Sequence, residues 1–265
     1  MTTLDAHVAQ CLAALRQRSD ELARVIAALS PAEWDGETNC PPWRIHDLAA
    51  HLVSSGEGFL MNIQRGLSGT VEPGPGRPER QAQLAAAGPE DVSAALRQVT
   101  VDFERLYEGL SQEQLETVCF HRRGNRPVRW YAAHRLAEVA FHGWDLETSL
   151  GRRPVLDAAT ARLLLPMLLE SNVPRTYAAG LSQARGSGER FLLSIEDDPT
   201  ATWLVTIDAD ALHVARGDAA ADLRVTASAA DLALLVYGRA DLTTFAGVEG
   251  DPALVQRFAQ IFPRP

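Results

Sequence analysis

The segment 134–145, HRLAEVAFHGWD, carries residue types that can do chemistry. It places His134, Glu138, His142 and Asp145 at successive spacings of four, four and three, with apolar residues between them. On an α-helix a step of four residues turns the side chain through only about 40°, so these residues form one slanting row. Imidazole and carboxylate groups in such a row can converge on one metal ion.

A second group of ligand-type residues lies earlier in the chain, in the segment WRIHDLAAHLVSS at 43–55. Its His51 lies among apolar residues of a helical pattern, so it faces the interior or the edge of a helical bundle. A histidine from that helix could complete a three-ligand site with Glu138 and His142. Three protein ligands leave room for water, a thiol or substrate, which is typical of a catalytic metal. The alternative from spacing alone is a buried polar network satisfied by hydrogen bonds.

The elements that must position these residues are long helices in the first 150 residues. Apolar residues there recur at spacings of three and four, which is the helical period. Segments rich in Pro and Gly interrupt the pattern, and GTVEPGPGRPER at 69–80 predicts a flexible loop. The predicted helices cover about 4–29, 45–66, 88–110 and 127–149. Four helices of this length predict a four-helix bundle.

The C-terminal third of the chain has a different pattern. Residues 151–185 are less regular, and Pro166 predicts a kink or break in a helix there. Short segments rich in β-branched residues follow and predict strands, and two amphipathic helical patterns come after them. The predicted fold class is therefore α+β, with a bundle over 1–150, a helical connector over 151–185 and an α+β domain over 186–265.

Composition excludes several classes of function. The net charge is −9 with no basic patch, which argues against a nucleic-acid partner. No apolar run approaches the roughly 18–20 residues of a membrane span, and the acidic, periodic start is unlike a signal peptide. All 25 basic residues are arginines, so Schiff-base and P-loop lysines are excluded. We expect a cytoplasmic protein without a membrane or nucleic-acid partner.

The cysteines do not predict a metal site of their own. Cys11, Cys40 and Cys119 are far apart and form no CxxC or zinc-knuckle spacing, so a thiolate cage is not expected. Free cysteines are often buried as small hydrophobic residues. We therefore interpret all three as reduced thiols without a specific role.

Two motifs resemble those of a known family. The segments PPWRIHDLAAHLVSSGEGFL and HRLAEVAFHGWDLE resemble the DinB-like superfamily, and within it the mycothiol-dependent maleylpyruvate isomerase family. That family has a DinB-like, metal-binding four-helix bundle followed by a small α/β domain that resembles sterol-carrier-type folds. The segment DLALLVYGRADL is similar to the family's Leu-rich segment ending in Gly-Arg, so the resemblance spans nearly the whole chain.

The resemblance implies roles for five residues. His51, Glu138 and His142 match the family's ligands to a divalent metal, usually Zn²⁺. Asp145 matches a trailing acid, which either supports a metal ligand or lies near the thiol cofactor. Arg239 matches the Gly-Arg position, from which it would reach toward the site as a second catalytic residue. The implied cosubstrate is mycothiol, whose thiolate attacks an electrophilic small molecule and gives isomerisation or S-transfer.

Further residues near these motifs have two interpretations each. Arg126 and Arg129 belong to the densest positive cluster and are predicted to bind the anionic groups of a cofactor or substrate, although surface arginines are usually only solvated. His134 is interpreted as a core or supporting histidine rather than a fourth ligand. His121 is interpreted as a solvated loop residue.

The alternative to an enzyme is a non-catalytic protein that binds a metal and a thiol, or that senses a small ligand. This alternative predicts that the protein binds a metal but catalyses no turnover. We expect a monomer or a homodimer in either case.

Overall fold

The computed structural model describes residues 5–245 and 247–262. The chain divides into two compact units, with the boundary between Leu156 and Asp157. The first unit is almost entirely helical, and the second combines a five-stranded sheet with helices. The predicted α+β class, with a helical bundle first and a mixed domain second, is confirmed. The finer division at residues 150 and 185 stays a prediction.

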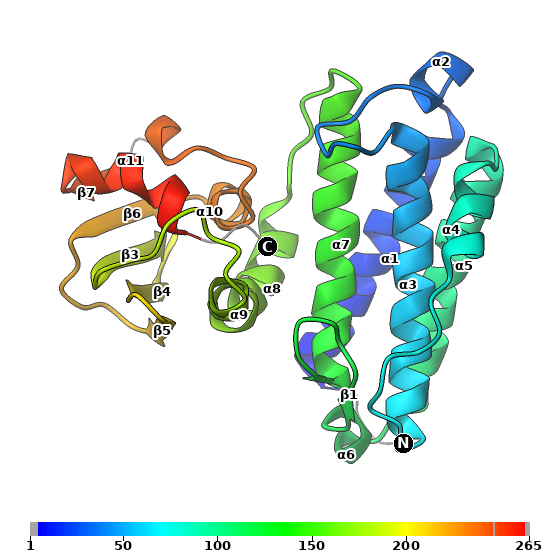
Figure 1. Ribbon diagram of the computed structural model, residues 1–265, viewed down its shortest axis with the longest axis horizontal. Helices are drawn as coiled ribbons and strands as arrows, with labels where there is room; N and C mark the ends of the chain where they lie inside the picture. Colours follow the sequence, from blue (N-terminus) through cyan, green and yellow to red (C-terminus); the bar gives the residue numbers. More distant parts are fainter. Residues whose placement is uncertain (1–4, 246, 263–265) are drawn as a thin grey trace. The chain divides into compact units, whose positions relative to one another are not determined.

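In the described part of the first unit, four long helices form a bundle, whose arrangement Figure 1 shows. Helix α1 packs against α5 and α7, and α3 packs against the same two helices. Helices α1, α3 and α5 each bury an apolar stripe at the helical period, which is the physical basis of such a bundle. The four helices are α1 (Ala6–Ala27), α3 (Ile45–Leu67), α5 (Pro89–Glu108) and α7 (Val128–Ser149).

Helix α7 is buried on most of its circumference rather than on one stripe. Its small residues Ala133, Ala137 and Ala140 are buried, and Leu22 of α1 lies 3.4 Å from where a Cβ on Gly143 would be. Several polar residues of this helix are therefore buried or nearly so, among them Arg135 and Asp145, and there they need polar partners. The histidines and carboxylates of α7 are therefore candidates for a polar or metal-binding site within the bundle.

Short elements connect the long helices. The short helix α4 packs against α3, and Pro78 stands at its start, where a proline is well tolerated. The predicted flexible loop at 69–80 therefore ends earlier than expected, at the first turn of α4. The connecting elements are α2 (Pro31–Trp34), α4 (Pro78–Ala85), α6 (Gln112–Leu115), β1 (Val118–Cys119) and β2 (Arg126–Pro127).

The second unit begins with a nearly continuous helical stretch. Helix α8 (Ala158–Met167) contains Pro166 but continues into a π-helical turn, η1 (Leu168–Asn172), and then into α9 (Val173–Ala178). A π turn leaves backbone carbonyls displaced from the regular ladder, which accommodates a proline without ending the helix. Of the predicted kink or break at Pro166, the break does not occur, and an irregular turn follows the proline.

The sheet of the second unit has the order β5-β4-β3-β6-β7. Strands β3 and β6 are parallel, and the other neighbours are antiparallel. Phe191 lies opposite Val205 and Leu223 in the central register. The strands are β3 (Glu189–Ile195), β4 (Asp198–Ile207), β5 (Leu212–Arg216), β6 (Leu223–Ala227) and β7 (Gly247–Gly250).

Three helical elements complete the second unit: α10 (Ala229–Val236), the 3₁₀ turn η2 (Leu242–Thr244) and α11 (Pro252–Ile261). Phe258 of α11 packs edge-on against Phe191 of the sheet. Within the residues that the structure describes, no helix is both long and apolar enough to cross a membrane.

Candidate metal centre

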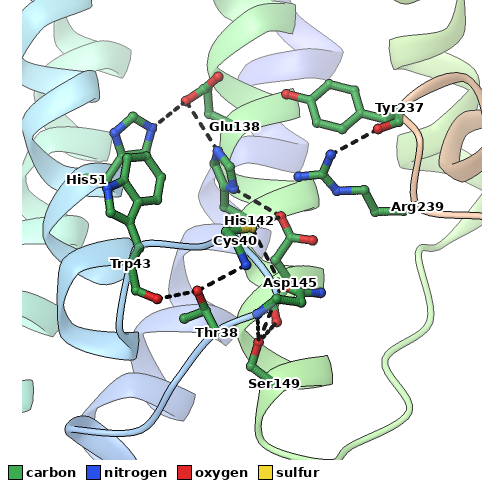
Figure 2. A network of polar contacts seen from close by, with 11 residues as sticks. Thr38, Cys40, Trp43, His51, Glu138, His142, Asp145, Ser149, Tyr237 and Arg239 are labelled. Carbon is green, nitrogen blue, oxygen red and sulfur yellow. Dashed lines mark hydrogen bonds and ion pairs between the residues drawn. The ribbon is translucent and has the colours of Figure 1, made fainter. Parts of the chain in front are cut away.

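Helices α3 and α7 bring His51, Glu138 and His142 together (Figure 2). The Nε2 atom of His51 lies 3.1 Å from Oε2 of Glu138, and Nε2 of His142 lies 4.0 Å from the same oxygen. One ligand-type atom from each residue lies within 4.8 Å of the other two. Residues from two helices, far apart in the sequence, thus converge on one point.

This donor set fits a divalent metal ion. Donors held tetrahedrally at Zn–N and Zn–O distances are separated from one another by about 3.4 Å. The separations of 3.1 and 4.0 Å bracket that value. Two imidazoles and one carboxylate are donors that Zn²⁺ and similar divalent ions accept. The residues present therefore fit the metal that the resemblance implies.

The environment keeps Glu138 ionised. Its burial acts to raise the pKa, but the hydrogen bond with His51 and the nearby imidazoles of His134 and His142 outweigh it and hold the pKa of Glu138 well below its ordinary value. The carboxylate is therefore an acceptor or ligand at neutral pH. The side chain of His51 remains 25% exposed, so solvent reaches the group from that side.

Asp145 orients the imidazole of His142. Its Oδ2 lies 3.1 Å from Nδ1 of His142, and the residue is 1% exposed. A buried carboxylate favours the tautomer with the proton on Nδ1, which leaves the Nε2 lone pair facing Glu138. The predicted acid thus acts on His142, three residues before it.

The loop before α3 closes one side of the group. The ring of Trp43 lies 4.6 Å from that of His51 and 6.2 Å from that of His142, measured between centroids. Thr38 accepts from the backbone N–H of Cys40 and donates to the carbonyl of Trp43, as Figure 2 shows. The loop is therefore held in shape by its own hydrogen bonds, and Trp43 forms an aromatic wall.

Cys40 is a residue of this site that the sequence interpretation missed. Its thiol donates to Oδ2 of Asp145 at 3.3 Å, and its side chain is partly accessible. The backbone N–H of Asn39 beside it donates to Ser149 Oγ, at the end of α7. No spacing rule connects Cys40 to Asp145. The one signal in the sequence is that Cys40 shortly precedes the helix that carries His51.

The predicted cofactor-binding arginines lie at the other end of α7. Arg126 is buried, stacks over Trp130 at 4.8 Å and donates to backbone carbonyls of the preceding loop. Arg129 pairs with Glu116 and lies about 20 Å along the helix from His142. The structure does not bring either arginine to the trio formed by His51, Glu138 and His142. The alternative interpretation, a solvated surface arginine, is wrong for Arg126, because the loop and Trp130 enclose its guanidinium.

His134 belongs to an aromatic cluster. It stacks on Trp130 at 4.2 Å, while its Nε2 lies 3.9 Å from Oε1 of Glu138. Its Nδ1 is buried and has no hydrogen-bond partner among the described residues. Burial is the main reason that the pKa of His134 falls to about 4. The ring is therefore neutral and packed, in agreement with its interpretation as a core histidine.

His121 is buried, so the prediction of a solvated loop residue is wrong. It packs against Trp130 at 5.0 Å and against His134 at 5.3 Å. Burial, followed by the charges of His134 and nearby arginines, lowers the pKa of His121 to about 3. The segment between β1 and β2 folds over the start of α7, and this tertiary contact buries a side chain that a polar loop sequence led us to expect in solvent.

Arg239 lies in the second unit, after α10. Its Nη1 donates to the carbonyl of Tyr237 at 3.0 Å, and its guanidinium lies over the Tyr237 ring at 4.9 Å. Its predicted catalytic role stays a prediction.

Comparison with known families agrees with a helical bundle followed by a second, mixed domain. Residues 15–147 match the family described as the mycothiol maleylpyruvate isomerase N-terminal domain, and residues 175–263 match the SCP-2 sterol transfer family. The class of protein is therefore a DinB-like bundle joined to a sterol-carrier-type domain. The chain belongs to the mycothiol-dependent maleylpyruvate isomerase family.

Solved structures share the fold of this chain. The crystal structure of the mycothiol-dependent maleylpyruvate isomerase matches with a TM-score of 0.64 and 17% identity over 97% of this chain and 96% of that one. A histidine-to-alanine mutant of that isomerase matches with a TM-score of 0.63 and 16% identity over the same shares. At these identities the likeness shows the shared fold.

Two uncharacterised proteins of Mycobacterium tuberculosis are similar in sequence. One is 28% identical over 244 residues, which cover 88% of this chain and 86% of the relative. The other is 26% identical over 183 residues, which cover 68% of this chain and 85% of the relative.

Proposed function

We propose that this chain is a divalent-metal-dependent enzyme that uses a low-molecular-weight thiol, mycothiol, against an electrophilic small molecule. The observation that carries the proposal is the convergence of His51 and His142 on the carboxylate of Glu138, which stays ionised. Three protein ligands with one accessible side are typical of a catalytic metal. Membership of the family supports mycothiol as the thiol.

His51, Glu138 and His142 would hold the ion, for which we propose Zn²⁺. When bound, the ion supplies Lewis acidity and lowers the pKa of a thiol or water beside it. Glu138 contributes the charge that partly neutralises the dication, because its carboxylate stays ionised inside the bundle.

Asp145 and Trp43 complete the proposed site. Asp145 retains the Nδ1 proton of His142 and fixes the ring, so it acts as a positioning residue. Trp43 limits access of water on the side of the loop. Arg239 is retained as a proposed catalytic residue, on its match to the family's Gly-Arg segment.

The proposed chemistry begins with attack of the mycothiol thiolate on a carbon–carbon double bond conjugated to a carbonyl. A C–S bond forms, and the π electrons move toward the carbonyl oxygen. If the adduct rotates and the C–S bond breaks again, the thiolate is regenerated and the net result is cis–trans isomerisation. If a proton from solvent reaches the carbon instead, the S-conjugate is the product.

Two measurements test the proposal. Protein purified without chelator is expected to contain about one divalent ion per chain. Incubation with mycothiol and a panel of α,β-unsaturated acids and epoxides, followed by mass spectrometry, is expected to yield isomers or adducts.

Glu138→Gln removes the charge and is expected to abolish turnover, whereas His213→Gln, a change at an exposed residue of the second unit, serves as the control. A metal-loaded protein that leaves the whole panel unchanged would instead support the metal- and thiol-binding alternative.

A further inference from the structure

A second group of ligand-type side chains adjoins the trio. It consists of Cys40, Asp145 and the Nδ1 side of His142, and one ligand-type atom from each lies within 4.8 Å of the others. Oδ2 of Asp145 is 3.3 Å from Cys40 Sγ and 3.1 Å from His142 Nδ1. Figure 2 shows this group beside His142, on the side away from Glu138. The two groups therefore use opposite nitrogens of the same imidazole.

The second group has a different metal preference from the first. A thiolate, an imidazole and a carboxylate form a softer donor set than two imidazoles and a carboxylate. Such a set favours thiophilic divalent ions, of which Cd²⁺ is a convenient probe. Asp145 is buried and Cys40 is partly accessible, so an ion would enter past the thiol and meet a fixed carboxylate behind it.

We propose that Cys40, His142 and Asp145 form a second site for a thiophilic divalent ion, occupied as an alternative to the first. A neutral imidazole has one nitrogen lone pair and one N–H. In the first site Nε2 supplies the lone pair and Nδ1 donates to Asp145. In the second site Nδ1 supplies the lone pair, the ring proton moves to Nε2, and the Cys40 thiol releases its proton to solvent.

The two sites cannot be filled at once by neutral His142. Occupation of the second site also removes the Nδ1–H contact with Asp145 and turns the Nε2 proton toward Glu138. A thiophilic ion would thus inhibit the enzyme by taking His142 from the trio. This consequence rests on the proposed function, whereas the existence of the second site does not.

The test is titration of the metal-free full chain with Cd²⁺, with stoichiometry and the ultraviolet thiolate-to-cadmium charge-transfer absorption measured together. The wild type is expected to bind one ion per chain and to show the absorption. Cys40→Ser is expected to bind one ion without it, and His51→Ala to bind one ion with it. Cys11→Ser, a change at a buried cysteine of α1 whose thiol contacts His7, is the matched control and should keep the absorption.

The outcomes separate this inference from the proposed function. Absence of the absorption in the wild type, or its persistence in Cys40→Ser, would overturn the second site. Two ions per wild-type chain would overturn the alternation through His142. If Cys40→Ser shows the folded circular dichroism spectrum but binds no Cd²⁺, the second site stands and the proposed function fails. Asp145→Asn, which preserves shape, provides a second variant and should weaken the absorption.

Discussion

The two halves of α7 hold histidines in opposite surroundings. Toward the end of the helix, His142 lies between the carboxylates of Glu138 and Asp145. One helical turn before Glu138, His134 stacks on Trp130 and packs against His121. The residue type and the helical spacing are the same in both halves, and only the neighbours differ.

This difference shows that the partner of the second ring nitrogen decides what a histidine can do. In His142 a buried carboxylate holds one nitrogen, so the other presents a lone pair in a fixed direction. In His134 the Nδ1 atom has no partner among the described residues and burial keeps the ring neutral. An unoriented imidazole among aromatic rings packs as a flat, weakly polar side chain.

The largest expected effect comes from removing a ligand at the carboxylate end. His142→Ala should raise the dissociation constant for Zn²⁺ by more than the roughly 10–100-fold that loss of a supporting group costs. Competition with a chromophoric chelator measures this constant. Wild-type affinity in both His142→Ala and His51→Ala would contradict the assignment of the trio.

A smaller loss is expected when the ligand remains and its support changes. Asp145→Asn keeps an acceptor for His142 Nδ1 but removes the negative charge, and metal affinity should fall by roughly 10–100-fold. The same competition measurement applies, and circular dichroism checks that the bundle is intact. Unchanged affinity would mean that Asp145 does not orient His142.

The aromatic cluster of His121, Trp130 and His134 should make the free energy of unfolding depend on pH in the acidic range. The folded pKa of His121 is about 3, below the roughly 6.5 of an unfolded histidine. Between these values the unfolded state binds more protons, so the free energy of unfolding decreases as the pH falls below about 6.5. Each pH unit within this window lowers the free energy of unfolding by up to about 1.4 kcal/mol for one such histidine.

Urea titrations of metal-free protein at pH 6.5, 5.5 and 4.5 measure this dependence. In His121→Phe, unfolding should take up about one proton fewer over this range. The free energy of unfolding should therefore fall by about 2–3 kcal/mol less between pH 6.5 and pH 4.5 than in the wild type. His213→Gln, at an exposed histidine, should leave the slope unchanged. An equal slope in His121→Phe and wild type would show that burial of His121 does not govern the acid response.

The smallest effect on metal binding is expected at His134. His134→Phe keeps the aromatic stack on Trp130 and should change the affinity for Zn²⁺ by less than about threefold, which is under about 1 kcal/mol. It also removes a buried nitrogen without a partner among the described residues, so the protein should become more stable by about 1 kcal/mol. Loss of the metal would instead make His134 a ligand.

Much of the bundle was predictable because helices depend on local periodicity. The predicted helix at 127–149 agrees closely with α7, and the one at 45–66 with α3. The strands of the second unit were recognisable from β-branched runs between turn residues. The parallel pairing of β3 with β6 was not, because such a pairing joins segments separated by other strands and is decided by packing.

The candidate site was predictable only in part. Glu138 and His142 share one helix, so their spacing places them on one face. The apolar pattern around His51 made it a candidate third ligand, and the family resemblance implied the ligand role of all three. Arg126 and Arg129 were assigned to the site because they belong to the densest positive cluster, but they lie at the start of α7, and the length of that helix separates them from His142. Proximity in sequence does not imply proximity at a site when a rigid rod lies between.

The sequence by itself determined the row of ligand-type residues on α7, because the helical period is a property of the local backbone. Only the tertiary structure decided which of them have partners. It brought His51 to Glu138, placed Cys40 against Asp145 and packed the loop that carries His121 against the start of α7. These contacts depend on how helices and loops pack, and packing energy is a sum over many distant residues that no local spacing encodes.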